Sequence, residues 1–176
     1  MTTAPQSLRL RLYPDPVLRT RASEVVSIDD DLRARVKRMF EIMYQHRGIG
    51  LAAPQVGVSE RVFVVNLTGD RRQPGEELVF INPEIRDPRG ECVEEEGCLS
   101  FPDVRLDVAR PELVRIEATD LEGDRFSIDA DGWLARCVQH ELDHLDGVLF
   151  VARVPMQSRL SIRERLQDLE RAYGES

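Results

Sequence analysis

The sequence predicts an α+β fold, in which antiparallel strands pack around one central helix and a further helix lies toward each end of the chain. Residues 130–147 have the apolar spacing of an amphipathic helix. Segments rich in β-branched and aromatic residues, which read as strands, occupy 61–67, 78–82, 112–119 and the region near 126–128. With 176 residues and no repeat or linker, the chain is predicted to form a single domain over 1–176.

Helical spacing predicts the first and last helices. The first runs from about 29 to 46, begins with three aspartates that suit a helix N-terminus, and stops before Gly48. Its apolar side consists of Leu32, Val36, Met39, Phe40 and Met43. The last helix is introduced by Pro155 and Ser158, and its apolar face consists of Ile162, Leu166 and Leu169.

The turn residues between the strands indicate how they connect. Polar residues from Gly69 to Gly75 form a loop between the first two strands, and Pro83 is expected to close the second. The segment 112–119 alternates apolar and polar residues, and Gly123 separates it from the next short strand. These two strands are therefore predicted to form an antiparallel hairpin.

Composition and charge exclude several functional classes. Hydrophobic residues make up 41% of the chain and charged residues 32%, and no apolar run approaches the roughly 20 residues of a membrane helix. The opening MTTAPQS lacks the cationic start and apolar centre of a secretory signal. A net charge of −8 without a basic cluster argues against sequence-specific nucleic-acid binding. The odd count of three cysteines suits a reducing compartment, so we expect a cytoplasmic location.

The central helix carries the clearest chemical pattern in the chain. In the string HELDH at 140–144, two imidazoles share one helix face, where both can hold one metal ion with a carboxylate beside them. At about 100° per residue, His140 and His144 share an arc with Trp133 and Cys137. The helix also has an apolar arc and a polar arc, which consist of Leu134, Val138, Leu142 and Leu145, and of Arg136, Gln139, Asp143 and Asp146, respectively.

A catalytic two-histidine site needs a third protein ligand, and Cys98 is the best candidate for it. Cys98 lies in the acidic segment EEEGCLSFP at 94–102, and its thiolate suits iron or zinc. Cys92 has no flanking pattern, and Cys137 lies only one turn before His140 on the same helix. The alternative is an ordinary solvated loop that contains a buried small residue.

The segment GIGLAAPQ at 48–55 is small and apolar. Its glycines allow the backbone to pass close to another chain or a ligand. It lacks the Lys-Ser/Thr ending of a phosphate-binding loop. Gln55 is the only side chain in it that can hydrogen-bond to a reacting group.

Three segments, GIGLAAPQ at 48–55, EGCLS at 96–100 and QHELDHLDG at 139–147, together resemble the signature motifs of peptide deformylases. Their order and spacing match, and no motif position is substituted. Members of this family remove the formyl group from the initiating methionine of new bacterial and organellar proteins. The resemblance implies a metal-dependent hydrolase that acts on N-formylmethionyl nascent peptides, releases formate and contacts ribosomes transiently.

The resemblance implies that Cys98, His140 and His144 bind one divalent metal ion, with water as the fourth ligand. In this family the ion is typically Fe²⁺, although Zn²⁺, Ni²⁺ and Co²⁺ can occupy the site. Glu141 would be the general acid and base. A metal lowers the pKa of its bound water from about 15.7 toward neutrality, so Glu141 would accept a proton as hydroxide attacks and then protonate the leaving amine.

The remaining motif residues would bind the substrate and its oxyanion. The resemblance assigns the oxyanion to the side-chain amide of Gln55 and the backbone N–H of Leu99. It assigns a backbone contact with the substrate to Gly50. Ile49 and Cys137 are expected to line the pocket for the methionine side chain, which would add affinity with little selectivity among similar side chains.

Four residues near the motifs have less defined roles. Glu96 and Arg105 are close enough in sequence to form an ion pair that supports the Cys98 loop, and a simple surface role for either is the alternative. The motifs assign nothing to Trp133 and Arg136.

Two other functions fit parts of the pattern. HELDHLDG also matches the start of an HExxHxxG zinc protease, but the third histidine of that class would fall at Phe150. A protease class that uses a downstream glutamate would need Glu164 or Glu170, which lie on an amphipathic helix. A non-catalytic, metal-stapled binding module would need a fourth protein ligand and would have no use for Glu141.

Overall fold

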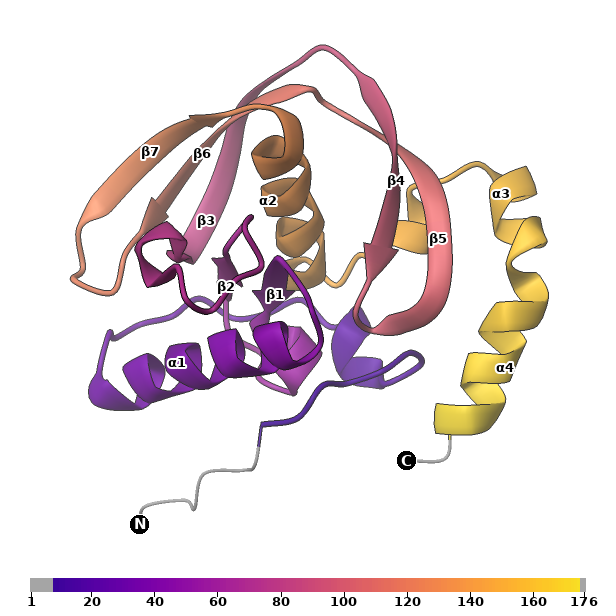
Figure 1. The fold of residues 1–176 in the computed structure, drawn as a ribbon, viewed down its shortest axis with the longest axis horizontal. Coiled ribbons are helices and arrows are strands. Elements are labelled where there is room, and N and C mark those ends of the chain that lie inside the picture. Colours follow the sequence, from indigo (N-terminus) through magenta and orange to yellow (C-terminus); the bar gives the residue numbers. More distant parts are fainter. Residues whose placement is uncertain (1–7, 175–176) are drawn as a thin grey trace.

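The computed structural model describes residues 8–174, which form two antiparallel sheets around a central helix (Figure 1). The segment 1–7, in which we found no secretory signal, lies outside the described residues. The larger sheet has the strand order β1-β2-β3-β6-β7, and the smaller sheet pairs β4 with β5. The strands are Gly50–Ala52 (β1), Val62–Val65 (β2), Leu78–Arg89 (β3), Cys92–Cys98 (β4), Phe101–Arg110 (β5), Leu113–Thr119 (β6) and Arg125–Ala130 (β7).

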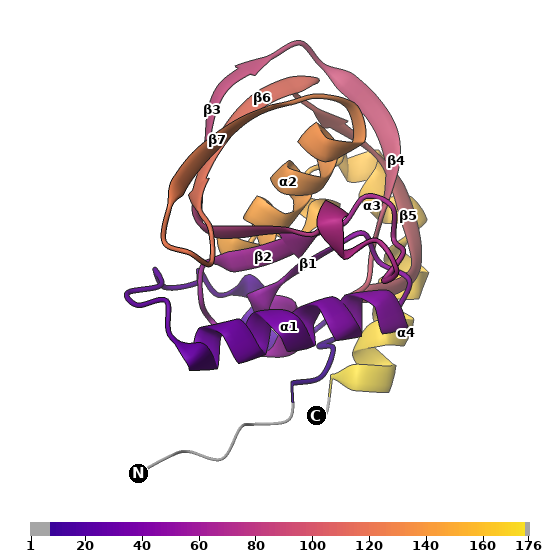
Figure 2. The ribbon, with the colours of Figure 1, turned by 60° about the vertical axis from the view of Figure 1, so that its left-hand side comes forward.

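Helix α2 (Gly132–Leu145) lies between the two sheets, as Figures 1 and 2 show from two directions. Helix α1 (Asp30–Gln45) lies beside the β1–β2 end of the larger sheet, while α3 (Met156–Ser161) and α4 (Arg163–Tyr173) follow on the side of β5. The predicted fold class is therefore confirmed. The described residues also form four short 3₁₀ helices, at Pro16–Arg19 (η1), Ala53–Val56 (η2), Pro74–Glu76 (η3) and Phe150–Ala152 (η4).

Helix α1 agrees with the prediction for 29–46. The Asp29 side chain accepts a hydrogen bond from the backbone N–H of Leu32 at 2.8 Å, which caps the first turn. The predicted apolar side is buried against β1 and β2. This packing holds the segment after α1, which leads directly to the glycine-rich motif.

The core between α2 and the larger sheet is apolar. Ala135, Val138 and Leu145 of α2 belong to one buried cluster with Phe63 of β2 and Phe80 of β3. The two phenylalanine rings stack with their centroids 4.7 Å apart. Because such burial is non-directional, it fixes the helix against the sheet without fixing any single side chain.

The strands differ from the prediction in three places. One is β1, a short strand in the glycine-rich segment, which was not predicted as a strand. Strand β3 continues beyond Pro83, because this proline falls where the ladder with β6 already shifts register between Ile81 and Glu84. The β4–β5 hairpin, which covers most of 92–110, was not predicted. The predicted β6–β7 hairpin is confirmed, with antiparallel pairing from Val114 with Ala130 to Thr119 with Arg125.

The C-terminal segment forms two helices instead of the single helix that was predicted. The break falls at Ile162, between α3 and α4. Of the predicted apolar face, Leu169 is buried and packs with Tyr13 and Phe101 in a third apolar cluster. Within residues 8–174, no helix has the length and apolar character needed to span a bilayer.

Candidate active site

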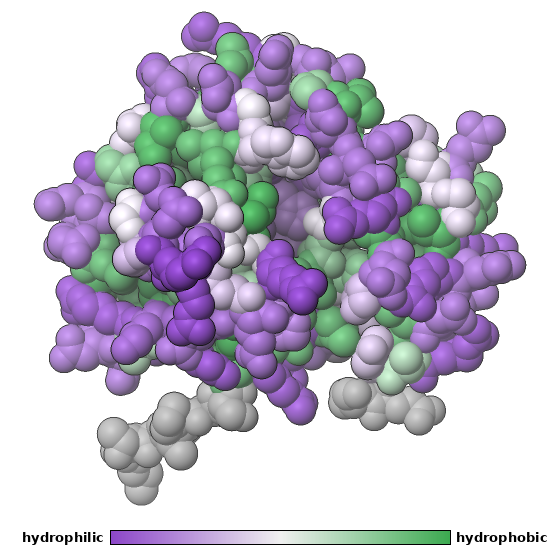
Figure 3. Space-filling view, viewed as in Figure 1, coloured by the Kyte–Doolittle hydropathy of each residue, from purple (hydrophilic) through white to green (hydrophobic). Residues whose placement is uncertain are grey.

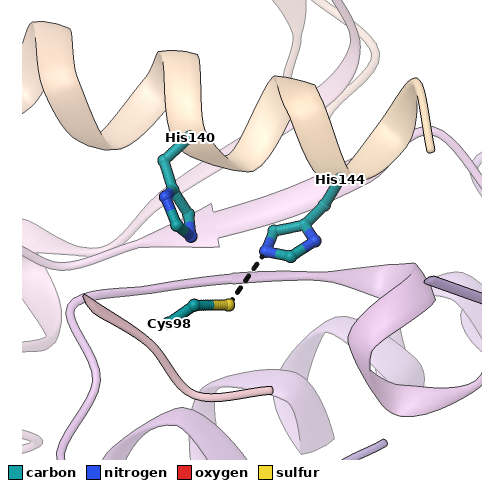
Figure 4. Close-up of side chains that lie close together, drawn as sticks. All are labelled: Cys98, His140 and His144. Carbon is teal, nitrogen blue, oxygen red and sulfur yellow. Dashed lines mark hydrogen bonds between the residues drawn. The ribbon is translucent and has the colours of Figure 1, made fainter. Parts of the chain in front are cut away.

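The structure brings the three predicted metal ligands together. The ligand atoms of Cys98, His140 and His144 lie within 4.8 Å of one another, and the Cys98 sulfur is 3.3 Å from Nε2 of His144. In Figure 4 the two rings project from α2 toward the cysteine, which comes from the segment facing the helix. Both histidines are buried and Cys98 is partly buried. No other such group of ligands occurs within residues 8–174.

The end of the β4–β5 hairpin positions Cys98. The ladder shifts register between Gly97 and Cys98, and Cys98 then pairs with Phe101 across a two-residue connection. Phe101 is 1% exposed and packs against Tyr13 and Phe150. The cysteine is thus anchored by a strand whose side chains enter an apolar core.

A buried carboxylate, that of Glu96, holds the His140 ring at its Nδ1 atom. Oε2 of Glu96 lies 3.0 Å from Nδ1 of His140, which leaves the other ring nitrogen to face Cys98. Glu96 also accepts hydrogen bonds from Arg110 Nε at 2.5 Å and from Arg136 at 2.7 Å. Burial of Glu96 opposes its ionisation, but its hydrogen bonds with His140 and Arg110, and their charges, outweigh burial and lower its pKa to about 2.

The charged network extends through Asp143 to the segment after α2. Arg110 donates to Asp143 at 2.9 Å, and Asp143 also accepts from Arg153 Nε at 3.0 Å. Arg136 additionally donates to the backbone oxygens of Val108 and Cys92. The network therefore joins α2 to both strands of the β4–β5 hairpin.

These contacts correct one expectation and add to another. Glu96 pairs with Arg110 and Arg136 and not with Arg105, which forms no ion pair with another residue of 8–174. The arc of α2 that was assigned as its polar side is largely buried, since Arg136, Gln139 and Asp143 are all buried. Charged residues on that arc find partners inside the protein and not in solvent.

Gln55 lies beside the ligand cluster with its amide orientation fixed. Its Oε1 accepts a hydrogen bond from the backbone N–H of Ala52 at 2.9 Å, so the amide nitrogen is the group that faces the site. Nε2 donates to Ser100 Oγ at 3.2 Å and lies 3.5 Å from the Cys98 sulfur. The 3₁₀ helix η2 supplies this position, and Gly57 ends that helix with φ 85°.

Gly50 allows β1 to pass directly over the side of α2 that carries Glu141 and Cys137. A Cβ atom at this position would lie 2.6 Å from Oε1 of Glu141 and 2.7 Å from the Cys137 sulfur. Both distances are shorter than any normal contact, so only glycine fits here. The predicted close approach of the glycine-rich segment is thus an approach to the Glu141 carboxylate.

The Glu141 carboxylate is buried with one oxygen unused. Among the described residues, Oε2 has no hydrogen-bond partner. Burial raises the pKa of Glu141 to about 7, with the charge of His140 opposing the rise and that of Glu96 adding to it. A carboxyl group in this state can accept and return a proton near neutral pH.

The surroundings of the two histidines shift their pKa values in opposite directions. Burial lowers the pKa of His144 well below its usual value, and the charge of His140 adds to this, so the His144 ring is neutral and keeps a lone pair. Burial also opposes charge on His140, but its hydrogen bonds with Cys98 and Glu96 outweigh burial and raise its pKa. One sulfur and two imidazole nitrogens are together a donor set that fits a divalent transition metal.

The cluster opens into a cleft of about 750 Å³. Every predicted site residue except His144 lines this cleft, namely Ile49, Gly50, Gln55, Cys98, Leu99, Cys137, His140 and Glu141. Figure 3 shows the face of the molecule on which a hollow opens, with both hydrophobic and hydrophilic side chains around it. Trp133 and Arg136 also line the cleft. The signal for Trp133 was present in the sequence, because it shares the helical arc of the two histidines.

The rival ligand sets do not assemble. Phe150 is buried with its ring centroid 5.8 Å from that of His140, in place of a third histidine. Glu164 and Glu170 lie on α4, and Glu170 accepts a hydrogen bond from the Tyr13 hydroxyl. No fourth protein ligand joins Cys98 and the histidines within the described part of the chain.

The comparisons with known proteins agree with this geometry. Residues 7–160 match the polypeptide deformylase family. A peptide deformylase of Acidobacterium capsulatum is 48% identical over 160 residues, which cover 91% of this chain and 94% of that protein. A peptide deformylase of Neisseria meningitidis is also 48% identical, with the same coverage.

Two solved structures have the same fold over nearly the whole chain. A peptide deformylase from Plasmodium falciparum superimposes with a TM-score of 0.92 and 40% identity, covering 96% of this chain and 98% of that one. Peptide deformylase 1B of Arabidopsis thaliana, in complex with an inhibitor, superimposes with a TM-score of 0.90 and 43% identity, covering 96% and 93%.

Proposed function

The chain belongs to the peptide deformylase family, and we propose that Cys98, His140 and His144 hold its metal ion while Glu141 and Gln55 carry out the chemistry. The protein is a metal-dependent hydrolase that removes the formyl group from the N-terminus of newly made polypeptides. The observation that carries the assignment of residues is that one thiol, two imidazoles, a buried carboxylate and an oriented amide lie close together, and that all of them except His144 line one cleft.

The donor set suits Fe²⁺, and Zn²⁺, Ni²⁺ and Co²⁺ are alternatives. When bound, such an ion supplies Lewis-acid chemistry, since it polarises a carbonyl oxygen and lowers the pKa of water from about 15.7 toward 7. Glu96 fixes the orientation of the His140 ring from behind. The thiolate of Cys98 adds negative charge and makes the site sensitive to oxidation.

Glu141 moves the protons. Its unpartnered Oε2 accepts a proton from the attacking water and then gives it to the nitrogen of the leaving amine, so that formate and a free N-terminus are released. Gln55 Nε2 and the backbone N–H of Leu99 hold the oxygen that becomes negative during attack. Loss of one such donor costs about 10²–10³ in rate.

The substrate binds with its methionine side chain against Ile49 and Cys137. Gly50 lets the β1 backbone run beside both Glu141 and Cys137, where it can contact the substrate backbone. Because a formyl carbon carries only a hydrogen, a tight site beside Gly50 accepts it and excludes bulkier acyl groups.

The cellular setting belongs to the same proposal. We infer that 1–176 acts as a single deformylase domain in the cytoplasm, meets nascent chains through transient contact with ribosomes, and has no sequence-specific affinity for nucleic acid. The net charge of −8 supports the last point.

The central test is formate release from formyl-Met-Ala-Ser by protein purified without oxygen and loaded with Fe²⁺, with a chelated sample as control. The Glu141→Gln variant should keep its metal and release no formate, because it cannot carry the proton. Full activity of Glu141→Gln, or equal activity after chelation, would contradict the mechanism.

A further inference from the structure

Three arginines from separate parts of the chain line the rim of the cleft. Arg9 belongs to the N-terminal arm, Arg47 follows α1 and Arg105 lies on β5, and all three are exposed. None of them forms an ion pair with another residue of 8–174. The chain has 32 acidic and 24 basic residues, so carboxylates are available to pair with most arginines. Three unpaired guanidinium groups at the opening of one cleft are therefore unexpected.

Arg105 is placed beside the metal ligands by the β4–β5 hairpin. It pairs with Gly97 in the ladder, and its guanidinium group lies across that glycine, where a Cβ atom would be 3.0 Å from Arg105 Nε, Cζ and Nη1. Gly97 directly precedes Cys98. The absence of a side chain at 97 thus lets the cation lie over the strand at the cleft wall.

Arg47 is placed by an unusual backbone conformation. Its φ of 59° is in the left-handed region, which few residues other than glycine adopt. This conformation turns the chain from the end of α1 into the glycine-rich segment that begins at Gly48. Among the described non-glycine residues, only four have positive φ, and Arg47 and Asp103, both lining the cleft, are two of them.

Carboxylates on the cleft wall do not neutralise these three cations. Glu96 is buried and held by Arg110 and Arg136, and Glu141 belongs to the catalytic centre. Asp103 is held by Arg165 at 2.7 Å. Glu95 is the one remaining acidic side chain of the lining, so the rim carries three unpaired cations against one anion.

We propose that Arg9, Arg47 and Arg105 select formylated peptides that carry carboxylates in the residues just after methionine. The inference rests on the proposed function, in which the formyl group lies at the inner end of the cleft and the following residues leave over the rim. A formylated N-terminus has no ammonium charge, so side-chain charges decide the attraction. Guanidinium groups bind carboxylates through paired hydrogen bonds.

The test compares formyl-Met-Asp-Asp-amide with its uncharged isostere formyl-Met-Asn-Asn-amide, using the metal-loaded protein. We expect kcat/KM for the Asp peptide to exceed that for the Asn peptide by about three- to tenfold, the range of two exposed ion pairs. Formyl-Met-Lys-Lys-amide should fall below both. The ratio is measured at one ionic strength, because salt screens these contacts.

A triple variant assigns the preference to the rim. In Arg9→Ser/Arg47→Asn/Arg105→Ser, the Asp-to-Asn ratio should fall to about one or lower, with asparagine chosen at 47 because it tolerates positive φ. The matched control, Arg21→Ser/Arg89→Ser/Arg163→Ser, removes the same charge from exposed arginines that do not line the cleft. It should keep the wild-type ratio.

Binding without turnover gives a second measurement. Trp133 is the only tryptophan and lines the cleft, so its fluorescence in the Glu141→Gln variant reports peptide affinity, which should rank Asp above Asn. If formyl-Met-Asn-Asn-amide is deformylated but the Asp peptide gains nothing, or if the gain persists in the triple variant, the inference is wrong while the proposed function stands. If no peptide is deformylated, the proposed function fails first.

Discussion

The two sides of helix α2 are held by different kinds of interaction. Toward the five-stranded sheet, Val138 and its apolar neighbours pack against Phe63 and Phe80. Toward the β4–β5 hairpin, the same helix presents charged groups that bind Glu96 and Arg110. Both sides are buried, so burial alone does not distinguish them.

The two kinds of contact have different roles: the apolar contacts hold the fold together, and the charged contacts position the residues of the candidate site. Apolar burial is roughly proportional to area and has no preferred direction, so it secures the helix as a body. Hydrogen bonds to a carboxylate have a defined geometry, so the contact between Glu96 and His140 fixes one ring nitrogen toward Cys98. Substitutions on the two sides should therefore separate stability from metal binding.

The largest effect is expected from Glu96→Ala. The change leaves Arg110 and Arg136 buried without their carboxylate, which should lower the free energy of unfolding by about 3–5 kcal/mol. It also frees the His140 ring and should weaken metal affinity about 10–100-fold. Urea unfolding and competition with a chelator measure the two effects, and Glu94→Ala, an exposed neighbour on β4, is the control. Unchanged metal affinity in Glu96→Ala would show that the carboxylate is only structural.

A smaller loss, of stability alone, is expected from Val138→Ala on the apolar side. Removing two buried methyl groups should lower the free energy of unfolding by about 2 kcal/mol. Metal affinity and formate release per folded molecule should stay at wild-type values. A drop in metal affinity comparable to that of Glu96→Ala would break the proposed division between the two sides of α2.

The smallest effect is expected from Gln139→Ala, which tests whether a polar contact of α2 that does not involve Glu96 affects metal binding. Gln139 Nε2 donates to the backbone oxygens of Pro111 and Ala135, and neither bond involves Glu96 or a predicted ligand. Its loss should lower the free energy of unfolding by about 1 kcal/mol and leave metal affinity unchanged. Weakened metal binding here would mean that any polar contact on this side positions the ligands.

The sequence predicted which residues lie together at the candidate site better than it predicted the residues that support them. HELDH places two imidazoles and a carboxylate together by helical geometry alone. Cys98 and Gln55 were candidates from their residue types, and the other motif residues came from a family resemblance. Glu96 was noticed, but its partners were not, because Arg110 and Arg136 lie 14 and 40 residues away. Which charged groups meet across two strands and a helix depends on how those elements pack.

The missed β4–β5 hairpin has a similar cause. Its first strand contains three successive glutamates, which read as a solvated loop, and only Glu96 of the three is buried. Its second strand did carry a signal, because Val104, Leu106 and Val108 alternate with exposed Arg105 and Asp107. Counting that alternation would have predicted β5 and, by pairing, β4.

The most direct measurement of the central claim is the absorption spectrum of the protein loaded with Co²⁺ without oxygen. We expect one cobalt per chain and a thiolate-to-cobalt charge-transfer band, because the Cys98 sulfur lies 3.3 Å from His144 Nε2 in the ligand cluster. Cys98→Ala should lose the band and most of the metal, while Cys92→Ala should keep both. A Cys98→Ala protein that retains the band and one cobalt per chain would contradict the account.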